Sequence, residues 1–257
     1  SVSPGIGGQT VYFTSISVRL SQTGNPDGTR YRILASTKGL TTVDFSSSGI
    51  MSTDVAETTF TIFGLAINAT YFIASESLNY QSRVSSRTII STSTLAGIPG
   101  GSTATIVGLS SITVSWTAGP NPLTPRTSYQ MQVSTSADFA VHSTSVTFNT
   151  FATTAALSIN TTYFFRVSAF NRHGVPSDFN EILSTATRSL APGIESFQVF
   201  NTSIAVQIAT NTNPAGTAVI LTSGSFSTEE SVTDIFSAPV STVNMRNLDP
   251  NTLYTFQ

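Results

Sequence analysis

The sequence predicts an all-β chain built of three tandem sandwich domains. Serine and threonine alternate with Val, Ile, Phe and Tyr along most of the 257 residues, a pattern typical of strands with hydroxylated outer faces. Hydrophobic residues make up 39% of the chain and aromatic residues 10%, which is enough apolar surface for packed cores. No run of helical periodicity exceeds a turn or two. One group of motifs recurs three times, which indicates a repeated unit.

The repeat is marked by four landmarks in a constant order. A Pro-Gly pair is followed by an alternating apolar run, then by an Asn-Pro pair, and later by a tyrosine three positions after an asparagine. The tyrosines recur about 90 residues apart, the size of one small domain. In chain order the copies are Pro4, Pro99 and Pro192; residues 14–20, 110–116 and 202–208; Asn25, Asn121 and Asn213; and Tyr71, Tyr163 and Tyr254.

Each element of the unit reads as a strand or a turn. In residues 112–116 Ile, Val and Trp alternate with Thr and Ser, the period of a half-buried strand. Asn25-Pro-Asp-Gly is a turn sequence, because Pro fixes φ and Gly accepts a positive φ. Further strands are expected at 31–36, 129–134 and 218–223, then after each Asn-x-x-Tyr phrase, and finally at 88–94 and 184–187.

The Asn-x-x-Tyr phrase is expected to mark a corner between two sheets. A tyrosine at the start of a strand can bury its ring while its hydroxyl bonds to the backbone at the corner. The asparagines of the phrase, Asn68, Asn160 and Asn251, tolerate left-handed backbone geometry and cap turns. The phrase is therefore interpreted as structural and not as a repeated binding motif.

These residues resemble the fibronectin type III family over nearly the whole chain. The second unit is the most similar, through residues 110–122 with Trp116 and residues 157–171 with Tyr163. The resemblance implies a buried leucine six positions before each tyrosine. Leu20 and Ile208 stand where the family has its tryptophan, and a generic immunoglobulin-like sandwich is the alternative fold. The implied core and corner residues are Leu20, Leu65, Tyr71, Trp116, Leu157, Tyr163, Ile208, Leu248 and Tyr254.

The sequence offers no constellation for catalysis. His142 and His173 are the only histidines and cysteine is absent, so neither a zinc site with usual spacing nor a nucleophile–base–acid set is visible. We therefore expect no enzyme activity, no catalytic residue, no metal and no cofactor. Scattered arginines and a single lysine make no basic patch for nucleic acid. No apolar run is long enough to span a membrane.

The predicted domains are residues 1–97, 98–190 and 191–257. The linkers between them are short and contain proline, which favours extended backbone and limited swing. The third domain is predicted to lack its last strand or strands, because the sequence stops just after its tyrosine phrase. Two readings follow, either an excerpt of a longer protein or a strand donated by another chain, and the excerpt is favoured.

The function that these features favour is a non-enzymatic structural or spacer segment of a larger extracellular or cell-surface protein, such as a stalk, adhesin or filamentous appendage. Its partners are then other domains of the same longer chain, and a hydroxyl-rich surface also suits self-association or a protein or glycan ligand. One alternative is a recognition module acting through the loop of Asn171, Arg172, His173 and Gly174. Another is a set of accessory domains of a secreted polysaccharide-degrading enzyme.

Overall fold

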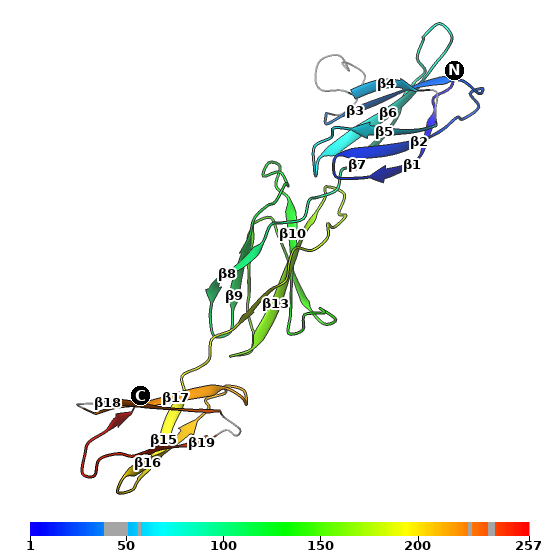
Figure 1. Ribbon diagram of the computed structural model, residues 1–257. Coiled ribbons are helices and arrows are strands. Elements are labelled where there is room, and N and C mark those ends of the chain that lie inside the picture. The colour runs from blue at the N-terminus through cyan, green and yellow to red at the C-terminus, as the bar shows by residue number, and fades with distance from the viewer. Residues whose placement is uncertain (39–50, 56–57, 226–227, 236–239, 257) are drawn as a thin grey trace.

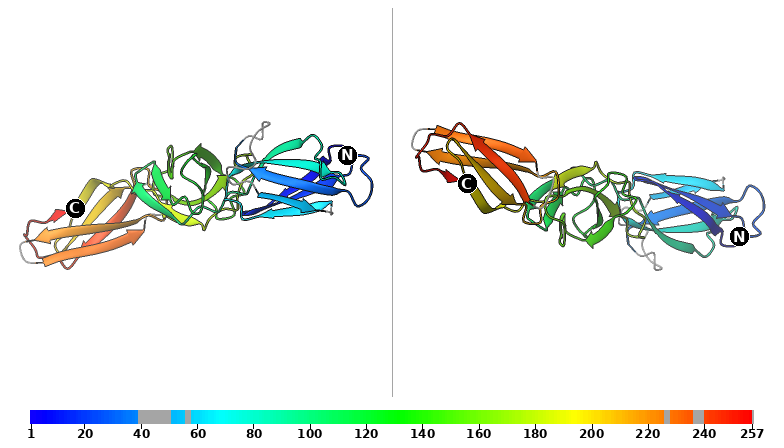
Figure 2. Two further views of the ribbon diagram at one scale, coloured as in Figure 1. Left: turned by 90° about the horizontal axis from the view of Figure 1, so that it is seen from above. Right: turned by 90° about the horizontal axis from the view of Figure 1, so that it is seen from below.

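The structure, a computed structural model, describes residues 1–38, 51–55, 58–225, 228–235 and 240–256. Every regular element in these ranges is a β-strand. The strands form six sheets, and successive pairs of sheets follow one another along the chain as three sandwiches (Figure 1). The views from above and below show the sandwiches end to end, with the first and third at opposite ends (Figure 2). The fold is all-β, as the sequence predicts.

The first sandwich packs a three-stranded sheet in the order β1-β2-β5 against a four-stranded sheet in the order β4-β3-β6-β7. Neighbouring strands in both sheets pair antiparallel. A register shift interrupts the β1–β2 pairing between Ile6 and Gly8. The strand bounds are β1 Gly5–Val11, β2 Ser15–Ser21, β3 Arg30–Ser36, β4 Met51–Val55, β5 Thr59–Phe63, β6 Thr70–Leu78 and β7 Thr88–Ser93.

The second sandwich repeats this arrangement. Its sheets have the orders β12-β9-β8 and β11-β10-β13-β14, and the same edge pairing carries a register shift, here between Ala104 and Ile106. A register shift at the same pairing in both sandwiches is typical of a β-bulge at the edge of a sheet. The strand bounds are β8 Ser102–Val107, β9 Ile112–Trp116, β10 Ser128–Ser134, β11 Ser143–Thr147, β12 Phe151–Thr154, β13 Thr162–Phe170 and β14 Leu183–Ala186.

The third sandwich has the orders β15-β16-β19 and β18-β17-β20. Among its described residues no strand corresponds to β7 or β14. One effect is visible on β15, where Val199 is 67% exposed although its counterparts Val11 and Val107 pack against their cores. The strand bounds are β15 Gly193–Val199, β16 Ser203–Ala209, β17 Ala218–Ser225, β18 Thr228–Ile235, β19 Val240–Arg246 and β20 Thr255–Phe256.

Each sandwich has its own core of alternating strand residues. Ile112, Val114 and Trp116 point inward from β9 and are 0–5% exposed, while Thr113 and Ser115 are half-buried on the other face. The Trp116 ring meets Tyr129 edge-on at 5.9 Å, a favoured aromatic geometry. Three separate buried clusters therefore stabilise the chain. The domain boundaries at 97/98 and 190/191 stay predictions, and the sheet pairs lie on either side of them.

Candidate functional site

The corner tyrosines hold the turn that precedes them. The Tyr71 hydroxyl accepts a hydrogen bond from the Ala66 N–H, and Tyr163 and Tyr254 do the same with Ser158 and Asp249, each at 2.8 Å. The three rings differ in burial, because Tyr71 and Tyr163 are 8% exposed while Tyr254 is half-buried beside the incomplete edge. Each tyrosine thereby fixes the backbone that carries the asparagine of its phrase.

The asparagines of the phrase have left-handed backbone. Asn68, Asn160 and Asn251 have φ values of 51°, 46° and 55°, a region that Asn enters more easily than most residues. This geometry turns the first two side chains away from their own sandwich and toward the next one along the chain. The sequence predicts the turn, whereas the contact with the next domain appears only in the structure.

Asn68 joins the first domain to the second. Its Nδ2 donates to the Thr127 hydroxyl at 3.1 Å and to the Phe170 carbonyl at 3.4 Å, and its N–H donates to the Leu95 carbonyl at 3.1 Å. The Asn68 side chain is only 1% exposed. Thr127 donates its own proton to Pro122 O at 3.0 Å, so its oxygen is left to accept from Asn68.

The second joint uses the same chemistry. Asn160 Nδ2 donates to the Thr217 hydroxyl at 2.8 Å, and the Asn160 N–H donates to the Arg188 carbonyl at 3.1 Å. Thr217 in turn donates to Pro214 O at 2.7 Å. The pairs Asn68–Thr127 and Asn160–Thr217 therefore occupy equivalent positions in two successive joints.

The asparagines of the Asn-Pro pairs form the second part of each joint. Asn121 binds both polar groups of Gly97 in the linker, accepting from its N–H at 2.9 Å and donating to its carbonyl at 2.8 Å. Asn213 binds Leu190 in the same manner, at 2.9 and 2.7 Å. A buried amide that satisfies a linker peptide on both sides fixes the direction in which the linker leaves. This pairing is called the linker clamp below.

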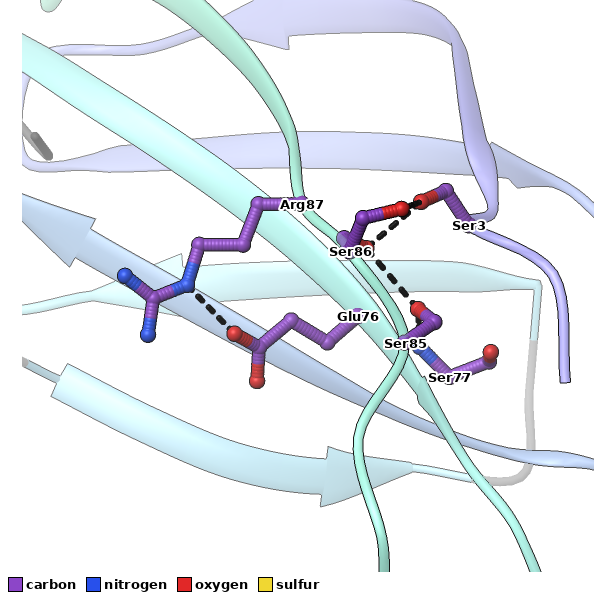
Figure 3. A network of polar contacts seen from close by, with 6 residues as sticks. All are labelled: Ser3, Glu76, Ser77, Ser85, Ser86 and Arg87. Atoms are coloured by element: carbon purple, nitrogen blue, oxygen red, sulfur yellow. Dashed lines mark hydrogen bonds and ion pairs between the residues drawn. The ribbon is translucent and has the colours of Figure 1, made fainter. Parts of the chain in front are cut away.

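The first domain contains a third linker clamp, in which Asn25 binds Val2 at 2.9 and 2.8 Å. The segment that carries Val2 is also tied to β6 and the loop before β7, because Ser77 donates to the Val2 carbonyl and Ser3 Oγ lies 2.6 Å from Ser86 Oγ. Figure 3 shows the contact of Ser3 with Ser86 beside the ion pair of Glu76 and Arg87. Glu76 is 2% exposed, and its carboxylate faces the Arg87 Nε.

Linker glycines allow the first joint to close tightly. A Cβ on Gly97 would lie 2.3 Å from the Pro120 ring, and one on Gly119 would lie 2.4 Å from the Ile98 carbonyl oxygen. Gly119 also has a φ of +62°, which side chains disfavour. The linker residues Ala96, Gly97 and Pro99 are buried in this joint, whereas Ala191 and Pro192 of the second linker are exposed.

The predicted recognition loop lies at the first joint. Asn171 Nδ2 donates to the Ser93 and Thr94 carbonyls at 3.4 and 3.3 Å, and His173 Nδ1 lies 2.8 Å from the Ser93 hydroxyl. Arg172 donates to the Asn68 carbonyl at 3.4 Å and to the loop carbonyls of Pro125 and Arg126. Gly174 follows with a φ of 76° and is exposed. Asn171 and His173 contact the first domain, and Arg172 contacts both the first domain and its own domain. A separate ligand for the loop stays a prediction.

The remaining residues that the resemblance singled out lie in the cores. Leu157 is half-buried against the second core, and the others are almost fully buried. Their exposed fractions are 4% for Leu20, 4% for Leu65, 5% for Trp116, 1% for Ile208 and 5% for Leu248. These side chains stabilise the sandwiches and contribute no polar group to a surface.

One of the titratable groups with a shifted pKa, Tyr129, lies next to the first joint, where its hydroxyl interacts with the Thr127 side chain. Burial raises the pKa of the Tyr31 and Tyr129 hydroxyls above the usual value. The Ala140 N–H, which donates to the Asp138 carboxylate at 2.9 Å, lowers the pKa of that exposed group. Within the described ranges no group of three or more His, Asp and Glu side chains is arranged to hold a metal ion.

Comparison with known proteins identifies the middle of the chain. The family model described as fibronectin type III domain matches residues 97–185, a stretch that begins before β8 and ends within β14. These residues form a fibronectin type III domain. The first and third sandwiches share its paired-sheet arrangement. No curated protein matches the sequence.

Several solved structures of fibronectin type III domains are similar to the chain. A two-domain segment of chicken tenascin has 19% identity and a TM-score of 0.43, with 73% of this chain and 98% of the tenascin segment covered. The FN1–FN3 domains of chicken CNTN1 have 14% identity and a TM-score of 0.34, covering 100% and 92%. The domain of human fibronectin type III domain containing protein 3 has 20% identity and a TM-score of 0.33, covering 36% and 86%.

Within the residues that the structure describes, no helix has the length and apolar character needed to cross a membrane. The polar groups that the sandwiches bring together from different domains are those of the joints. The candidate functional site of the chain is accordingly the pair of joints, each built from an Asn–Thr contact and a linker clamp.

Proposed function

We propose that the chain is a structural spacer segment of a larger extracellular or cell-surface protein, and that its joints set the order and orientation of its domains. The observation that supports this most strongly is the repeated joint, in which Asn68–Thr127 and Asn160–Thr217 recur with the same linker clamp. A chain that needed only to tether its ends has no use for buried polar contacts between neighbouring domains, because a flexible linker suffices.

The energetic scale is consistent with held joints. Each neutral hydrogen bond contributes about 1 kcal/mol, and leaving a buried donor without a partner costs about 1–3 kcal/mol. Several such bonds together favour one relative orientation over free swinging. A non-enzymatic role is part of the proposal, supported by a polar chemistry that is directed into joints and not into a pocket.

Small-angle scattering of the whole chain tests the proposal. The expected result is an elongated particle whose profile fits one shape. The double variant Asn68→Ala and Asn160→Ala should shift the profile toward an ensemble of bent shapes. The matched control is Asn201→Ala, which removes an exposed asparagine in the turn between β15 and β16. A compact or flexible profile for the unchanged chain would contradict the spacer role.

A second candidate function is recognition of a protein or glycan by the second domain. Leu123, Phe148 and Phe151 are 74%, 61% and 51% exposed and border a cavity of about 390 Å³ near Tyr129. Exposed aromatic groups around a hollow suit a ligand with an apolar face. Binding on a glycan array that is lost in both Phe148→Ala and Phe151→Ala would support recognition of a glycan. An array without any signal would contradict glycan recognition, and the spacer role would then be the one supported.

A further inference from the structure

In the second domain, one end contacts the preceding domain of the chain. The corresponding end of the first domain is built from the same kinds of residue. In the second domain these parts are Asn121, Thr127 and the loop opened by Asn171. In the first domain the corresponding parts are Asn25, Thr29 and the loop opened by Asn79. We call this surface of the first domain, formed by Asn25, Thr29, Asn79, Tyr80 and Gln81, the receiving face.

The two loops are closed by equivalent hydrogen bonds. Asn171 Oδ1 accepts from the N–H groups of His173 and Val175 at 3.0 and 2.9 Å. Asn79 Oδ1 accepts from Gln81 and Arg83 at 3.0 and 2.9 Å. The Asn79 loop of the receiving face therefore has the same closing hydrogen bonds as the Asn171 loop, which contacts the first domain.

The threonine of the receiving face is prepared in the same manner. Thr29 donates its proton to the Pro26 carbonyl at 2.7 Å, as Thr127 and Thr217 do with Pro122 and Pro214. Its oxygen is left as an acceptor, and among the described residues no donor to it is found. The linker position is also filled, because Asn25 clamps Val2 as Asn121 clamps Gly97.

The difference between the two domains is exposure. Thr127 and Asn171 are 3% and 5% exposed beneath the first domain, whereas Thr29 is half-buried and Asn79 is exposed. Tyr80, which stands where Arg172 reaches the Asn68 carbonyl, is 105% exposed. A cavity of about 400 Å³ lies between Asn25, Thr29, Asn79 and Tyr80, so the receiving face has room for an incoming turn.

We propose that the receiving face docks the Asn-x-x-Tyr end of another fibronectin type III domain joined to it in the same chain. The amide of the incoming asparagine donates to the Thr29 hydroxyl, and the Asn79 loop covers the incoming turn. We infer this occupant from the two joints, because in each of them the corresponding threonine accepts a hydrogen bond from the asparagine of an Asn-x-x-Tyr turn. The inference does not depend on the spacer role, since it concerns only what the receiving face binds.

A four-domain chain tests this directly. A second copy of residues 1–96 is placed immediately before Val2, the counterpart of Gly97, so that the joint keeps the natural register. Because the chain has no cysteine, a Thr10→Cys change in each copy allows two spin labels to be attached to exposed sites. The reference pair is Thr10→Cys with Ile106→Cys in the three-domain chain, which spans the existing first joint.

The expected result is a distance distribution across the new joint as narrow as that of the reference pair. It should broaden on Thr29→Val in the original copy and on Asn68→Ala in the added copy. Thr29→Ser retains the hydroxyl and should keep the narrow distribution. The control Thr59→Val, at an exposed position of β5, should keep it as well. The Asn68→Ala arm leaves the receiving face intact, so it separates docking from local damage caused by Thr29→Val.

Three outcomes would overturn the proposal. The first is a distance distribution as broad as that with a flexible Gly-Ser linker in the same place. The second is a narrow distribution that neither variant changes. The third is end-to-end association of the three-domain chain in sedimentation that Thr29→Val removes, which would assign the face to a second copy of the chain.

Discussion

A single asparagine in left-handed backbone links two levels of the structure. Asn68 completes the turn in front of Tyr71 and also donates to Thr127 of the next domain. The Tyr71 hydroxyl holds the turn through the Ala66 N–H, so the position of the amide depends on a bond within its own sandwich. Local corner geometry and the contact between domains are thus coupled through Ala66, Tyr71, Asn68 and Thr127.

Removing one corner hydroxyl tests how much the bond that holds the turn contributes to the stability of a sandwich. Tyr163→Phe leaves the Ser158 N–H without its 2.8 Å acceptor, which should lower the free energy of unfolding of the second domain by about 1–3 kcal/mol. Urea unfolding followed by the emission of Trp116, the only tryptophan, reports on that domain. Tyr80→Phe removes an exposed hydroxyl and should leave the midpoint unchanged, and an equal loss in both variants would refute the corner role.

At the level of elements, the first linker is shaped by glycines that face its neighbours at close range. Gly97 lies against Pro120, and Gly119 lies against the Ile98 carbonyl. The pairing leaves no space for a methyl group on either side, which is why the linker is buried in the joint. The second linker has Leu190 where the first has Gly97 and is more exposed.

Gly119→Ala should open the first joint. The added Cβ would lie 2.4 Å from the Ile98 oxygen at a φ of +62°, and such strain costs about 1–3 kcal/mol. We expect faster proteolysis of the linker around residues 95–100 and a lower Trp116 unfolding midpoint. Gly101→Ala has no atom within 4 Å of its Cβ and serves as the matched control. Equal cleavage rates for the two variants would contradict the expected strain.

The buried carboxylate of β6 provides a second test at the level of elements. Glu76→Gln keeps the shape of the side chain and removes the charge that faces Arg87. Since Glu76 is 2% exposed, we expect a loss of about 1–3 kcal/mol in the first domain. Hydrogen exchange of the β6 and β7 amides measures it. Glu181→Gln, on an exposed side chain, should not change the exchange of those amides.

For the whole molecule, the relative placement of the sandwiches depends on two joints that are not identical. The first receives Asn171, Arg172 and His173 in addition to the Asn–Thr contact and the clamp. Among the described residues, the side-chain contacts of the second joint are Asn160–Thr217, the Asn213 clamp and a bond from Asn211 to Ala191. The first joint is accordingly the more extensively bonded of the two.

Arg172→Ala should broaden the distribution of distances across the first joint and leave the distribution across the second joint unchanged. The guanidinium group bridges Asn68 to the loop carbonyls of Pro125 and Arg126, and the variant removes all three contacts. Spin labels at Thr10→Cys and Ile106→Cys report on the first joint, and labels at Ile106→Cys and Gln198→Cys report on the second. Broadening of both distributions would show a general loss of folding instead of a local effect.

Much of the fold could be predicted from the sequence because its signals are local. Alternation within residues 112–116 and the recurring Tyr71, Tyr163 and Tyr254 indicate strands and corners without knowledge of contacts. The joints could not be predicted in this way, since Asn68 and Thr127 lie on different sandwiches whose relative placement no local pattern encodes. One signal was present, namely a threonine after each Asn-Pro pair, at Thr29, Thr127 and Thr217.

The burial of the Asn68 amide also limits how the chain can be modified. Asn68-Ala-Thr and Asn160-Thr-Thr are acceptor sequences for N-linked oligosaccharides, yet the Nδ2 atoms that would carry the sugar donate to Thr127 and Thr217. An oligosaccharide on Asn68 and a closed first joint therefore exclude each other. Asn201-Thr-Ser lies in an exposed turn and accepts a sugar without this conflict. In a host that glycosylates such sequences, attachment at Asn68 during synthesis would yield a chain without the Asn68–Thr127 contact, in which the first and second domains are free to change their relative orientation.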